Sequence, residues 1–229
     1  MLTPDTITLI AHVLLGSLAV LLGAIALGAR KGRKVHVGAG RLFVVSMGIA
    51  SVLGAVLGAL KYETFWITFH AGILGATLVT SGVLAVRIHA RGVKVWFKAI
   101  AVLNALNAVA LFGAGWYATT LPDGHLFGFA AADYFFLFAM AAVVCGGDAR
   151  MIFGAKISNK LRIAQHLLRM CIGFFIAAGS AFTGPGASAF PQAVRDSGLL
   201  SLPELTIVLL MLFWLWRTLR KARPVVATQ

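Results

Sequence analysis

Seven apolar runs, each long enough to cross a bilayer as a helix, alternate with short polar segments along the chain. About 20 mostly apolar residues are needed to span the hydrocarbon core. The runs that meet this length cover residues 7–29, 36–60, 65–87, 95–117, 126–147, 161–182 and 202–219. Because the connections are short, the pattern predicts an all-α integral membrane protein, a seven-helix bundle that forms a single domain over residues 1–229.

The charged residues give these seven spans one consistent orientation. Basic residues gather in the loops after the first, third and fifth spans and after the seventh. Six of the seven acidic residues fall on the opposite side, and only Asp148 lies among the cations. The positive-inside rule therefore predicts an N-terminus outside the cell and a C-terminus in the cytoplasm.

The composition supports the same class of protein. The chain is 60% hydrophobic and 12% charged, with a mean hydropathy of +0.92, whereas an ordinary soluble domain is about a quarter charged. The formal net charge of +13 is spread in short clusters between apolar runs. This distribution indicates a lipid bilayer with anionic lipids at its cytoplasmic face as the partner, and no nucleic acid.

Polar side chains inside the spans are the candidate functional residues, because an ionisable group at membrane depth normally faces a partner, a cavity or a cofactor. Sorted by depth, they form two layers. The outer layer contains His12, His70, Asn104, Asn107, Asp133 and Glu204. The inner layer contains His36, His166, Arg41, Arg169 and Asp148. The remaining histidines, His89 and His125, lie in loops and are expected to be solvated.

Two of these histidines precede a glycine by four residues, in "HVLLG" at His12 and in "HVGAG" at His36. Positions i and i+4 lie on one face of a helix. The glycine therefore leaves the surface beside the imidazole bare. Such a surface suits a closely packed helix or a flat ligand.

These motifs resemble an uncharacterised bacterial family of predicted multi-span membrane proteins. The resemblance rests on H-x-x-x-G in the first span, H-x-x-x-G-R opening the second, and "QHLLRM" in the sixth. It implies a multi-pass protein of the bacterial cytoplasmic (inner) membrane, and it carries no assigned activity.

One functional hypothesis is a transmembrane redox protein with b-type haem. Two stacked bis-histidine haems would need an outer pair, His12 and His70, and an inner pair, His36 and His166. Axial imidazoles and the surrounding dielectric would set the potential. A quinone or another redox protein would then be the electron-transfer partner.

Three alternatives remain open on the sequence. A metal-dependent membrane enzyme could bind zinc through His12, His70 and Asp133. A polar-solute or proton-coupled transporter could line a polar path with Asp133, Glu204, the histidines, Asn104 and Asn107. A structural or assembly protein would need no cofactor, and Arg41 and Arg169 would then be anchors that reach the lipid headgroups.

Overall fold

The computed structural model describes residues 3–220. The chain is 84% helical, which confirms the all-α class. Seven helices are long and apolar enough to cross a membrane. They are α1 Pro4–Gly28, α2 Lys34–Leu60, α3 Tyr62–Val86, α4 Val93–Thr120, α5 Ala131–Phe153, α6 Asn159–Phe182 and α8 Leu202–Arg220.

The seven spans are confirmed, and the largest difference from the prediction lies at the fifth. The apolar pattern predicts a span over 126–147, whereas α5 begins at Ala131 and ends at Phe153. Residues before Ala131 form an antiparallel hairpin of β1 (His125–Leu126) and β2 (Phe129–Ala130). Its turn places Phe127 and Gly128 at φ values of 50° and 79°, as a tight hairpin requires.

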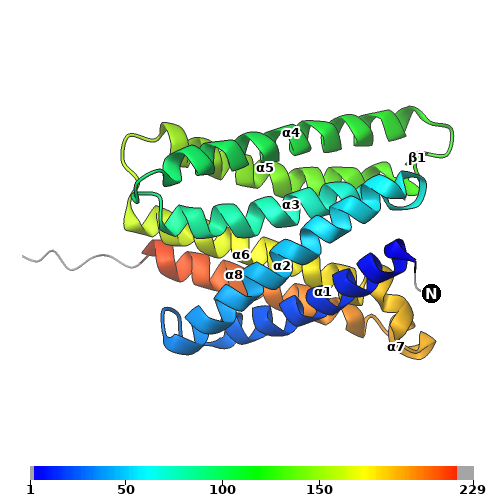
Figure 1. Cartoon of the computed structure of the whole chain (residues 1–229), viewed down its shortest axis with the longest axis horizontal. Helices are drawn as coiled ribbons and strands as arrows, with labels where there is room; N and C mark the ends of the chain where they lie inside the picture. Colours follow the sequence, from blue (N-terminus) through cyan, green and yellow to red (C-terminus); the bar gives the residue numbers. More distant parts are fainter. Residues whose placement is uncertain (1–2, 221–229) are drawn as a thin grey trace, which may run out of the picture.

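The long segment between α6 and α8 contains short helical turns. These are η1 Pro185–Ala189, α7 Gln192–Asp196 and η2 Leu199–Ser201. They lie at the same end of the bundle as the N-terminus (Figure 1).

α3 forms the centre of the bundle, with α2, α4 and α6 packed around it (Figure 1). Over its most apolar stretch, 56% of α3 is buried, against 11% for α8. α1 packs on α2 and α6, α5 packs mainly on α4, and α8 packs on α6. Polar side chains on α3 therefore point into protein, whereas α8 is left largely exposed, as a lipid-facing helix is.

Small residues allow α2 and α3 to approach each other closely. A Cβ added at Gly72 would lie 2.5 Å from the Ser51 carbonyl oxygen and 2.6 Å from the Ala55 nitrogen. Gly58 of α2 likewise packs directly against the backbone of α3 at Phe69. Only glycine fits at these two positions, which is the close packing that small residues provide between membrane helices.

The connecting loops divide the bundle into two ends. Loops 29–33, 87–92 and 154–158 lie at one end, here called the basic end (Figure 1). The N-terminus, the hairpin and α7 lie at the other, here called the acidic end. Seven antiparallel spans produce this grouping, and the positive-inside rule predicts that the basic end faces the cytoplasm. The tail cations Lys221 and Arg223 lie outside the described residues.

Candidate functional site

All four histidines of the spans use the same ring nitrogen to contact another helix. A carbonyl or amide oxygen can only accept a hydrogen bond, so Nδ1 of each ring carries the hydrogen. In the neutral imidazole Nε2 is then unprotonated, with a lone pair available to a ligand. The contacts are His12 to Ala50 O (2.8 Å), His36 to Ala26 O (2.9 Å), His70 to Asn107 Oδ1 (2.7 Å) and His166 to Gly82 O (3.0 Å).

His12 of α1 fits against the surface that a glycine leaves bare on α2. A Cβ at Gly54 would lie 2.9 Å from His12 Cε1 and 3.7 Å from Thr68 Cγ2 of α3. The glycine that makes room for this ring is therefore Gly54, whereas Gly16 of the H-x-x-x-G motif has no atom within 4 Å of an added Cβ.

His70 of α3 is buried and faces α4. Asn107 Nδ2 donates to the His70 carbonyl oxygen at 3.1 Å while its Oδ1 accepts from the ring. The indole of Trp66 and the ring of Phe69 meet the imidazole edge-on, with centroid distances of 5.0 Å and 5.1 Å. These contacts hold the ring in one orientation between α3 and α4.

The body of α3 separates the two outer histidines. Thr68 lies beside His12 on the α2 side, whereas His70 turns toward Asn107 of α4. Side chains two residues apart on a helix point in nearly opposite directions. The structure therefore does not bring the imidazoles of His12 and His70 face to face.

The proposed zinc ligands are likewise apart. Asp133 lies in the first turn of α5 and is exposed, and its carboxylate accepts from the Ala130 nitrogen at 3.0 Å. Glu204 accepts from the Thr183 hydroxyl at 3.1 Å. Within residues 3–220 no group of three or more His, Cys, Asp or Glu side chains could hold a metal ion.

The two inner histidines, in contrast, border one hydrophobic cluster. His36 is in the first turn of α2 and donates to Ala26, His166 is in α6 next to Leu167, and both Ala26 and Leu167 pack against that cluster. An added Cβ at Gly40 would meet no atom within 4 Å, so the surface beside His36 is open. Arg41 is exposed, as a headgroup anchor should be.

Lys31, in the loop between α1 and α2, caps the C-terminal end of α1 with its side chain. Its ammonium group donates to Leu27 O (2.5 Å) and to Ala26 O (3.2 Å), and lies 5.0 Å from the ring centroid of Trp214. Ala26 O also accepts from His36. Burial lowers the pKa of Lys31 below its ordinary value.

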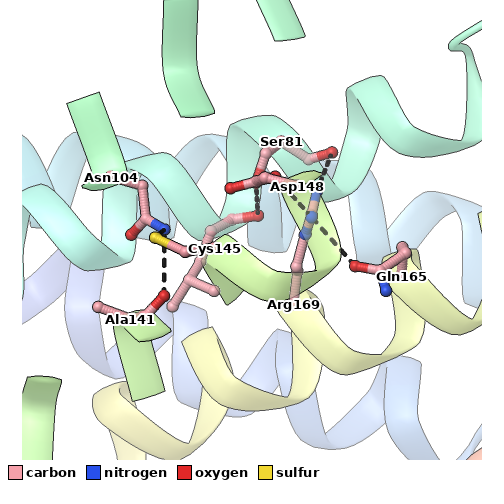
Figure 2. Close-up of polar contacts among 8 residues, drawn as sticks. Ser81, Asn104, Ala141, Cys145, Asp148, Gln165 and Arg169 are labelled. Carbon is pink, nitrogen blue, oxygen red and sulfur yellow. Dashed lines mark hydrogen bonds and ion pairs between the residues drawn. The ribbon is translucent and has the colours of Figure 1, made fainter. Parts of the chain in front are cut away.

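Another group of polar side chains lies where α3, α4, α5 and α6 meet near the basic end (Figure 2). Arg169 of α6 is fully buried, and its Nη2 donates to Asp148 Oδ1 at 2.7 Å and to Gln165 Oε1 at 3.0 Å. Its guanidinium carbon lies 5.1 Å from the ring centroid of Phe97. The charge of Arg169 is thus neutralised inside the protein.

The rest of this cluster, which includes Ser81 of α3, leaves two buried atoms unpaired. Asn104 Nδ2 donates to Ala141 O at 3.3 Å and contacts Cys145 Sγ at 3.2 Å. Asn104 Oδ1 and Arg169 Nε have no partner among the described residues. Such buried unpaired atoms are uncommon in proteins, and here they are one acceptor and one donor.

Sequence reasoning placed Arg169 and Asp148 in one layer but did not pair them. The interpretation of Arg169 as a headgroup anchor is wrong, because its side chain is enclosed on all sides. Two features of the sequence are consistent with the partners of Arg169. Asp148 is the one acidic residue among the basic clusters, and Gln165 precedes Arg169 by four residues, on the same helix face.

No protein-family model, curated protein or solved structure matches this chain. The resemblance to an uncharacterised bacterial family stays a prediction. The assignment as an integral membrane protein rests on the seven apolar helices.

Proposed function

We propose that this integral membrane protein is a redox protein of the bacterial cytoplasmic membrane that binds b-type haem. Nε2 of His36 and Nε2 of His166 would hold its iron. The observation that carries the proposal is the use of Nδ1 by both rings for a backbone carbonyl, together with the packing of Ala26 and Leu167, which adjoin these two contacts, against one hydrophobic cluster.

Metal-ligating histidines usually donate the other ring N–H to a carbonyl or carboxylate, which fixes the tautomer and the ring orientation. His36 and His166 both make such a bond, to Ala26 O and Gly82 O. Bound haem would supply one-electron chemistry, and its potential would depend on these ligands and on the local dielectric.

The outer histidines do not support a second haem in this proposal. His12 and His70 lie on different sides of α3, and each makes a specific contact with one neighbouring helix. Their role is therefore to join α1 to α2 and α3 to α4. We therefore propose one haem at His36 and His166 rather than two haems.

An apolar pocket supports a quinone as the redox partner. It has a volume of about 580 Å³ and lies between α1, α6 and α8. Its walls include Val20, Leu27, Phe174 and Ile207. A pocket lined mainly by apolar side chains suits a lipid-soluble carrier.

The test is an absorption spectrum of the purified protein, oxidised and then reduced with dithionite, with iron and zinc analysis of the same sample. We expect a Soret band, reduced α and β bands, and one haem per chain. His36→Ala and His166→Ala should each abolish the bis-histidine spectrum. The loop variants His89→Ala and His125→Ala are matched controls and should keep it.

Two results would contradict the haem proposal. A colourless protein without iron, purified from cells supplied with haem precursor, would leave the histidines as helix-packing groups. Zinc at one ion per chain in the colourless protein would favour the metal-enzyme alternative instead.

A further inference from the structure

A cavity opens at the basic end between the α3–α4 turn and the α5–α6 turn. Its volume is about 640 Å³. Four basic side chains line it, and all four residues are exposed: His89, Lys94, Lys98 and Lys156. Its deeper walls include Ile88, Phe97 and Met151, which are at most 3% exposed. The cavity thus has a cationic rim and an apolar floor.

The lysines of the rim have no anionic partner in the described part of the chain. The ion pairs there are Lys61–Asp5 at the acidic end and Arg169–Asp148 in the interior. Among the described residues, Asp148 is the one carboxylate of this half of the bundle, and Arg169 already neutralises it. Three ammonium groups therefore gather around one cavity without a carboxylate to balance them.

The start of α4 adds to the positive potential of the cavity. Lys94, Phe97 and Lys98 all belong to its first turns. Gly92 at its N-cap offers no side chain to the free N–H groups. The N-terminal end of a 28-residue helix carries partial positive charge and favours an anion.

We propose that this cavity binds a phosphate ester that carries an apolar group. The phosphate lies among Lys94, Lys98 and Lys156, because lysine ammonium groups bind phosphate oxygens as mobile point charges. The apolar group rests on Phe97 and Met151. The proposal is independent of haem binding, since none of the four histidines of the spans lines this cavity.

The phosphate can come from a lipid headgroup or from a soluble phosphate compound. Trp96, an exposed indole two residues from Lys94, indicates that the cavity lies at the depth of the lipid headgroups, where tryptophan is enriched. Both sources offer the same chemistry to the lysines. The experiment separates them.

The test titrates the purified full chain, in a nonionic detergent at fixed ionic strength, with two probes in parallel. One probe is dihexanoyl phosphatidic acid and the other is phenyl phosphate, a soluble phosphate ester with an apolar group, with dihexanoyl phosphatidylcholine as the zwitterionic control. Isothermal calorimetry measures the dissociation constant and the stoichiometry. We expect saturable binding of one anionic molecule per chain and none of the zwitterionic lipid.

The triple variant Lys94→Gln, Lys98→Gln, Lys156→Gln tests whether the cavity is the site. Each cation near a phosphate improves affinity by about fivefold, so the dissociation constant should rise by about a hundredfold. The matched control is Arg30→Gln, Arg33→Gln, Lys34→Gln. It removes the same charge from exposed positions at the same end, and it should change the constant by less than about threefold.

Saturation by the lipid alone supports a headgroup site, and saturation by phenyl phosphate alone supports a soluble phosphate ester. Either result upholds the cavity if only the Lys94, Lys98 and Lys156 variant is weakened. Absence of saturable binding by both probes overturns the proposal, and so does equal weakening in the two triple variants. Circular dichroism and gel filtration verify that both variants are folded.

Discussion

Two groups of cations near the basic end differ in their burial and in the presence of an acidic partner among the described residues. Arg169 is fully buried and is held by Asp148 and Gln165. Lys94 and Lys98, on the helix that also carries Phe97, are exposed and have no carboxylate nearby. Phe97 contacts both regions, since its ring lies under the guanidinium of Arg169 and also lines the cavity.

The difference follows from the cost of removing a charge from water. A buried charge without a partner is strongly destabilising, so Arg169 requires an internal acid. An exposed lysine needs no partner for stability and stays available for an external anion. Lys31 is the intermediate case, because it is partly buried and is held only by carbonyl oxygens and an indole.

Removing the acidic partner of the buried cation should have the largest effect on stability. Asp148→Ala should lower the free energy of unfolding by about 3–5 kcal/mol, because it leaves Arg169 buried and unpaired. Reversible unfolding in mixed micelles with increasing SDS measures the change.

The double variant Asp148→Leu, Arg169→Met is the control for that experiment. It removes both charges and should recover most of the lost stability. A double variant as unstable as Asp148→Ala would show that the cost comes from packing and not from the unpaired charge.

Of two adjacent glycines in α5, one contacts the ion-pair network and the other does not. A Cβ at Gly147 would lie against Gln165 Oε1, which accepts from Arg169, whereas a Cβ at Gly146 would meet nothing within 4 Å. Gly147→Ala should cost about 1.5–3 kcal/mol by displacing a hydrogen bond to a charged group. Gly146→Ala should be neutral or stabilising in the same assay.

The lowered pKa of Lys31 predicts that the stability of the folded protein depends on pH. Its pKa is lowered in the folded protein from the unfolded value of 10.5. The folded state therefore binds fewer protons than the unfolded state between the two pKa values. Stability should consequently rise with pH across that window and flatten above 10.5.

Thermal melting from neutral to alkaline pH measures this slope in the wild type, in Lys31→Met and in Lys34→Met. Only Lys31→Met should reduce it, since Lys34 is an exposed cation near the same loop. A slope that persists in Lys31→Met would assign the pH dependence to another group.

The smallest effect is expected at the exposed lysines. Lys94→Gln, Lys98→Gln, Lys156→Gln should change the free energy of unfolding by no more than about 0.5 kcal/mol per site when no anionic ligand is present. The SDS assay in a solution free of phosphate and anionic lipid tests this. A large loss would mean that these side chains support the fold directly.

Hydropathy was sufficient to predict the spans, because each must supply its own apolar length. It failed at residues 126–130, where the apolar side chains of Leu126 and Phe129 pack within a hairpin against neighbouring helices rather than continuing a span. It also ended the fifth span at residue 147, whereas α5 continues to Phe153.

The candidate sites depend on which helix face each residue occupies and on which helix lies beside it. Tertiary packing sets both. Grouping by depth alone therefore paired His12 with His70, although their imidazoles lie on different sides of α3. Depth also put Arg169 and Asp148 in one layer. Their direct contact could not be derived without knowing that α5 and α6 both border α3.

The order in which the helices are synthesised gives the ion pair a consequence for biogenesis. Asp148 belongs to α5, and its cation belongs to α6, so the ribosome produces the acid first. During that interval α5 carries a carboxylate into the bilayer without a cationic partner, which is unfavourable. A chain that stops before α6 therefore carries Asp148 without the cation that neutralises it in the folded bundle.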